Sequence, residues 1–241
     1  MRKETPQSVL PMALKVVAAC AAAVLLLVPA AALVGSSGLP QKNGASGEFV
    51  LAWGNDGGCP ALAIIGNLPE ASREAVVLLP GSSSDGASLR VALQNHGVDT
   101  LAALFMPTGS PFPRGANSLL RQFGLRRLII AEDSRSRTDW KPVQDKAMEL
   151  GAVQERIQPD NGRIWHTNFG QWNLTYHKLP DSEIRGTLKH VGDECQYVFE
   201  NRVTGEFILS SIDADGNSQE LFCQPRTNRN GSVRIPIKAE N

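Results

Sequence analysis

The stretch that decides the fold is residues 101–124, "LAALFMPTGSPFPRGANSLLRQFG", in which an apolar run passes through a Pro- and Gly-rich turn into an amphipathic segment. The run 101–106 predicts a buried strand, and residues 117–124 predict a helix capped by Asn117 and closed by Gly124. Turns that follow strands hold the catalytic groups of many α/β enzymes. This turn offers no side chain that binds a metal or moves a proton.

The segments on either side continue an alternation of strands and helices. Residues 86–97 predict a helix with Ser88 as its N-cap and Gly97 as its stop, and residues 139–152 predict another with Pro142 in its first turn. After residue 152 the apolar segments alternate and are short, which is typical of a β-rich region. This pattern predicts an α/β (α+β) fold. The expected strands before residue 152 are 48–53, 61–66, 74–81 and 125–133.

The pattern of the N-terminal part is typical of an export segment. Residues 16–35 carry no charge and would span about 30 Å as a helix, so we expect a transmembrane anchor or a signal peptide there, after a cytoplasmic stretch 1–15. The basic residues that precede the run favour a cytoplasmic N-terminus. A flexible linker, 36–48, then leads to a domain over 49–241 in the periplasm or outside the cell, which is secreted if the segment is cleaved.

Charge and cysteines restrict the partners of that domain. The whole chain has a net charge of 0, and residues 1–35 hold +2 of it, so the remainder carries −2 and nucleic acid is not an expected partner. Three cysteines, Cys59, Cys195 and Cys223, remain in the exported part. We expect a Cys195–Cys223 disulfide, since that compartment is oxidising.

Few residues suggest catalysis. The four histidines have no metal-binding spacing, and no Cys/His cluster occurs. Carboxylates at expected strand ends are the remaining candidates: Glu132 and Asp133 form the first pair to test, and Asp213 opens the turn "DADGN". Asp85 lies in the serine-rich turn "PGSSSDG", which we interpret as a hydrogen-bonded loop, because it lacks the spacing of a nucleophile elbow.

The order of elements adds a resemblance. The segments "FVLAWGNDGGCPALAII" (49–65), "VVLLPGSSSDGASLRVALQNHGVDTLAALFM" (76–106) and "GANSLLRQFG" (115–124) follow one another as in a known domain type. From Phe49 to about Ile212 the chain resembles the C-terminal metallo-β-lactamase-like domain of ComEC-type DNA-uptake (competence) proteins. In that family the domain also follows a membrane helix, and a metal motif H-x-H-x-D-H precedes the third segment.

The resemblance implies an αββα sandwich but not the chemistry of the family. Counted from the helix, the metal-binding positions fall on Pro107, Gly109, Pro111 and Phe112, none of which binds a metal. A later ligand falls near Ile212, one residue from Asp213, and the last histidine of the family has no counterpart here. Hydrolysis by metal-activated water needs those ligands.

We therefore expect a metal-free, cofactor-free pseudoenzyme that binds or scaffolds at the cell envelope. The membrane, through the N-terminal helix, and an envelope protein are its expected partners, and DNA uptake is the process that the resemblance implies. The alternative is an extracytoplasmic hydrolase with a carboxylate-based site.

Overall fold

The computed structural model of this chain describes residues 47–55, 59–66, 74–108, 112–132, 140–179, 184–201, 206–224 and 230–237. The chain divides into two units after Asn43, inside the predicted linker, and the described residues all belong to the second. The predicted export segment, 16–35, lies outside them. Within the described part, no helix is both long and apolar enough to cross a membrane.

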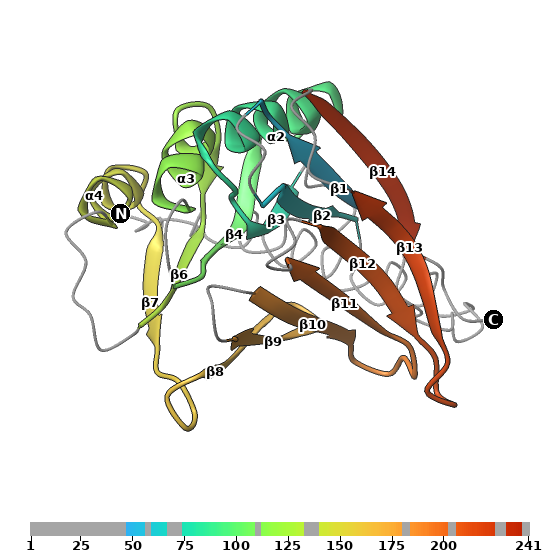
Figure 1. Cartoon of the computed structure of the whole chain (residues 1–241). Helices are drawn as coiled ribbons and strands as arrows, with labels where there is room; N and C mark the ends of the chain where they lie inside the picture. Colours follow the sequence, from blue (N-terminus) through green and yellow to red (C-terminus); the bar gives the residue numbers. More distant parts are fainter. Residues whose placement is uncertain are drawn as a thin grey trace, which may run out of the picture. The chain divides into compact units, whose positions relative to one another are not determined.

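An eight-stranded mixed sheet forms the centre of the domain (Figure 1). Its order is β14-β1-β2-β3-β4-β6-β7, with β5 paired to β4. Pairing is antiparallel from β14 to β3 and parallel from β3 to β7, because connections containing helices follow β3, β4 and β6. Its strands are β1 (Gly47–Trp53), β2 (Ala61–Ile65), β3 (Glu74–Leu79), β4 (Thr100–Met106), β5 (Gly124–Leu125), β6 (Arg127–Ala131), β7 (Val153–Ile157) and β14 (Gly231–Ile237).

Three helices cover one face of this sheet, as Figure 1 shows. They are α2 (Ser83–Asn95), α3 (Phe112–Leu120) and α4 (Lys141–Glu149). Leu89 and Leu93 bury the inner side of α2, and Leu119 and Leu120 do the same for α3. This burial of one apolar stripe per helix stabilises the layer.

A six-stranded antiparallel sheet packs on the other face, in the order β13-β12-β11-β10-β9-β8. Phe49 of the first sheet meets Tyr197 of the second with ring centroids 5.0 Å apart, and Phe105 meets Tyr176 at 5.4 Å, so both sheets share one core. The strands are β8 (Ile164–Phe169), β9 (Trp172–Lys178), β10 (Ile184–His190), β11 (Gln196–Asn201), β12 (Phe207–Ile212) and β13 (Ser218–Gln224).

The outer face of the second sheet is polar. Along β10, Ile184 and Leu188 are buried, whereas Arg185 and Lys189, which follow them, are exposed. This alternation is typical of an antiparallel sheet with one face toward water. The mixed α+β class predicted from the sequence is confirmed, and the described residues form three layers: helices, mixed sheet and antiparallel sheet.

Two helices begin earlier than the sequence analysis predicted. Ser82, not Ser88, is the N-cap of α2, and its hydroxyl accepts the backbone N–H of Asp85. Helix α3 begins at Phe112, so Asn117 lies inside the helix rather than at its start. Pro113 explains this start, because proline fits the first turn of a helix, where its missing N–H costs nothing.

The predicted Cys195–Cys223 disulfide is wrong. Cys223 of β13 pairs with Ile208, whereas Cys195 precedes Gln196, which pairs with Ile212 at the other end of β12. Four strand positions along the sheet separate Ile208 from Ile212, or roughly 13 Å. A disulfide requires Cα atoms within about 7 Å, so the strand register prevents this one.

Candidate functional site

The turn between β4 and α3 is where the resemblance puts a metal site. Pro107 is buried at the end of β4, and Phe112, only 2% exposed, begins α3. Gly109 and Pro111 lie outside the described residues. The two described positions present a pyrrolidine ring and a phenyl ring to the core, and neither group can bind a metal ion.

Thr108 of this turn belongs to a buried group of polar residues that also contains Cys59, Asp85 and Tyr176. Asp85 is 0% exposed. Its Oδ1 accepts the N–H of Gly54 at 2.6 Å, and its Oδ2 accepts the N–H of Ser82 at 2.9 Å. The carboxylate therefore joins the end of β1 to the start of α2, which is a structural role.

The neighbours of Asp85 are held in their neutral forms. Burial, and then the charge of Asp85, raise the pKa of the Cys59 thiol. Burial also raises the pKa of Tyr176, and the nearby Thr108 hydroxyl lowers it by a smaller amount. The Tyr176 and Thr108 hydroxyls make no hydrogen bond of ordinary geometry with a described residue. A buried neutral thiol and a buried neutral phenol are poor nucleophiles.

The carboxylate of Glu132, one of the predicted catalytic acids, accepts hydrogen bonds from two neighbouring side chains. Arg156 donates to its Oε1 at 3.0 Å, and the Gln158 amide donates to its Oε2. The backbone carbonyl of Glu132 accepts the indole N–H of Trp165 at 2.9 Å. Asp133, its predicted partner, lies outside the described residues.

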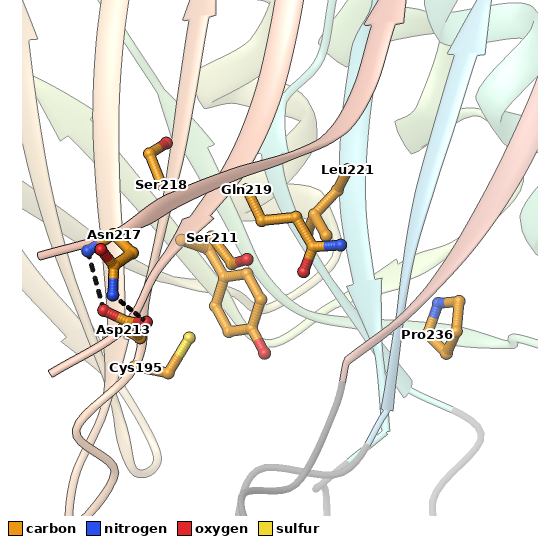
Figure 2. A pocket seen from close by; sticks show the side chains of 9 residues that line it. Cys195, Ser211, Asp213, Asn217, Ser218, Gln219, Leu221 and Pro236 are labelled. Carbon is orange, nitrogen blue, oxygen red and sulfur yellow. Dashed lines mark hydrogen bonds between the residues drawn. The ribbon is translucent and has the colours of Figure 1, made fainter. Parts of the chain in front are cut away.

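Asp213, the third predicted acid, lines a pocket of about 230 Å³ (Figure 2). The pocket lies where β11, β12 and β13 of the antiparallel sheet meet β14 of the mixed sheet. Leu221 and Pro236 form apolar walls, and polar side chains form most of the remainder. The nine lining residues are Cys195, Tyr197, Ser211, Asp213, Asn217, Ser218, Gln219, Leu221 and Pro236.

The Asp213 carboxylate is held in place by its own hairpin, as the dashed lines of Figure 2 show. The backbone N–H of Asn217 donates to Oδ1 at 2.8 Å, and the Asn217 amide donates to Oδ2 at 3.0 Å. These bonds, the side-chain bond foremost, hold the pKa of Asp213 below its usual value. Asp213 is therefore a carboxylate at neutral pH, with lone pairs left for a ligand.

The candidate carboxylates do not come together. Glu132 follows β6, whereas the Asp213 pocket borders β14, and five strand spacings separate β6 from β14 in the sheet order. At about 4.8 Å per spacing, that separation is roughly 24 Å. Paired catalytic carboxylates of glycosidases lie within about 10 Å. Glu132 and Asp213 therefore cannot share one reaction centre.

A second, more open groove of about 480 Å³ runs along α2 beside β14. Arg90 is its one charged lining residue, and serine and asparagine side chains form most of the wall. Within the described ranges, neither groove nor pocket gathers three His, Cys, Asp or Glu side chains that could hold a metal ion, nor does any other place.

Comparisons with family models, with curated proteins and with solved structures find no match to this chain. Sequence reasoning named Asp213 but missed the pocket around it. The walls come from four strands that follow one another in the chain, β11 to β14, but β14, which supplies Pro236, was not predicted at all. Its alternating pattern, "GSVRIPI", was the available signal.

Proposed function

We propose that this chain is an exported domain, held at the membrane by its N-terminal apolar segment, that acts by binding a partner in the cell envelope rather than by hydrolysis. One observation carries the proposal. The buried carboxylate nearest the turn after β4, that of Asp85, already accepts two backbone N–H groups at 2.6 and 2.9 Å. Because this carboxylate is also 0% exposed, neither substrate nor a metal ion reaches it from solvent.

We also propose that the architecture is a metallo-β-lactamase-like sandwich. The helical layer, the mixed sheet and the antiparallel sheet correspond to three of the four layers of that plan. On this interpretation, Pro107 and Phe112 occupy ligand positions, and the buried group of Cys59, Asp85, Thr108 and Tyr176 fills the space below them. DNA uptake is the envelope process that the resemblance favours.

The alternative, a carboxylate-based hydrolase, has weaker support. It needs two carboxylates near each other with different pKa values. Glu132 accepts hydrogen bonds from Arg156 and Gln158, and the pocket of Asp213 borders β14, which lies five strand spacings, or roughly 24 Å, from β6.

A substrate panel separates the two functions. The full chain, purified in detergent, is assayed on protein, glycan and phosphodiester substrates with and without added zinc or manganese. We expect no turnover above that of heat-denatured chain. Saturable turnover that is lost in Glu132→Gln, Asp133→Ala or Asp213→Asn, with the fold retained, would overturn the proposal.

A further inference from the structure

We propose that the Asp213 pocket receives a lysine or arginine side chain from an extended segment of a partner protein that pairs with the edge of β13 on which no described strand lies. The inference rests on the proposed binding function and names the chemistry of its partner. It is carried by the charge of the pocket, by its size, and by the strand edges beside it.

The pocket carries a single formal charge. Of its nine described lining residues, Asp213 is the one that is ionised at neutral pH, and none is Lys, Arg or His. Asn217 donates one hydrogen bond to each oxygen of the carboxylate, so a ligand meets an anion that is already oriented. A cation is the group that such a pocket complements.

The size and the walls suit one basic side chain. A volume of about 230 Å³ is below the roughly 300–1,000 Å³ of pockets that hold whole small molecules. Leu221 and Pro236 offer apolar contact to a methylene stem, while Ser211, Ser218 and Gln219 add hydroxyl and amide groups to the lining. Lysine and arginine combine such a stem with a charged tip.

The strand edges explain how that side chain arrives. Among the described strands, β13 pairs only with β12 and β14 pairs only with β1, so each ends its sheet. Pocket residues Gln219 and Leu221 lie two positions apart on β13, so they share one face of the strand. An extended segment that adds to an exposed strand sends alternate side chains to one face, and here that face is the pocket.

The test is a titration of the full chain in detergent with seven-residue extended peptides that alternate Thr and Val around a central Lys, Arg, Gln or Glu. Affinity is measured by fluorescence anisotropy, and peptide integrity by mass spectrometry. We expect Lys and Arg peptides to bind about 2- to 5-fold more tightly than the Gln peptide, the range of an exposed ion pair, with the preference declining as salt rises.

Matched variants locate the contact. Asp213→Asn should remove the preference for Lys and Arg, whereas Asp215→Asn, in the same hairpin but outside the pocket lining, should keep it. Gln219→Lys, at an exposed position on β13, should reverse the preference toward the Glu peptide. Unchanged urea midpoints establish that these variants fold.

Equal affinity for Lys and Gln peptides, or equal loss in Asp213→Asn and Asp215→Asn, would overturn the inference while leaving the proposed binding function intact. Cleavage of the peptides would instead contradict the proposed function, because binding would then serve hydrolysis.

Discussion

Replacing Asp85 tests the claim that the carboxylate below the turn is structural. In Asp85→Ala, the N–H groups of Gly54 and Ser82 lose their acceptors in a place that is closed to water. A buried donor left without a partner costs about 1–3 kcal/mol, so we expect a loss of about 2–6 kcal/mol in the free energy of unfolding. That is a large share of the stability of an ordinary domain, which is about 5–15 kcal/mol.

The assay is urea unfolding of the full chain, followed by the fluorescence of its tryptophans, of which Trp165 is buried. With a slope near 2 kcal/mol/M, a loss of about 4 kcal/mol lowers the urea midpoint by about 2 M. Asp85→Asn keeps one acceptor oxygen, and we expect about half the loss. Asp145→Ala, at an exposed site on α4, is the matched control and should stay within about 0.5 kcal/mol of the wild type.

A loss below about 1 kcal/mol in Asp85→Ala would refute the reasoning, because it would mean that water or a rearranged backbone satisfies both donors. Loss of an enzymatic activity at unchanged stability would also refute it, since Asp85 would then be a catalytic group.

Three further results are expected. Gly115→Ala should destabilise the domain by about 1–3 kcal/mol in urea, because a Cβ there would overlap the Pro80 carbonyl oxygen, whereas Gly124→Ala has room and should be near neutral. Partial burial, then Arg185 and His166, lower the pKa of His177, so stability should fall as pH drops through about 6.5, where the unfolded chain takes up the proton first. His177→Gln should flatten that fall, and identical slopes in both proteins would contradict this. Cys59 should resist iodoacetamide at pH 8 until urea unfolds the chain, and its labelling in the native protein would contradict its burial.

The central alternation of strands and helices was predictable because it depends on local signals. Buried β3 reads as an unbroken apolar run, and Gly97, with φ of 70°, ends α2 as predicted. The N-cap at Ser82 could also have been found, since "SSSD" has the capping-box spacing from Ser82 to Asp85.

The place of β14 at the edge of the mixed sheet was not predictable, because it depends on a contact between distant parts of the chain. Strand β14 pairs with β1, and Arg234 forms an ion pair with Glu48 across 186 positions. Strand β10, inside the second sheet, is hard to predict for a local reason: its buried position 186 is a glycine, Gly186, so the alternation of apolar side chains is interrupted there. The Asp213 pocket lies within residues 195–236, but β14, the last of its four consecutive strands, pairs with β1 instead of β13. That long-range pairing places Pro236 in the lining and is not visible in local patterns.

The metal content of the full chain tests the central claim most directly, namely that the turn between β4 and α3 is no catalytic metal centre. The chain is expressed and purified with zinc and manganese supplied, dialysed without chelator, and measured by elemental analysis. Because Pro107 and Phe112 give this turn no ligands and Asp85 is held by backbone donors, we expect far less than one ion per chain. One or two zinc or manganese ions per chain, retained through dialysis, would contradict it.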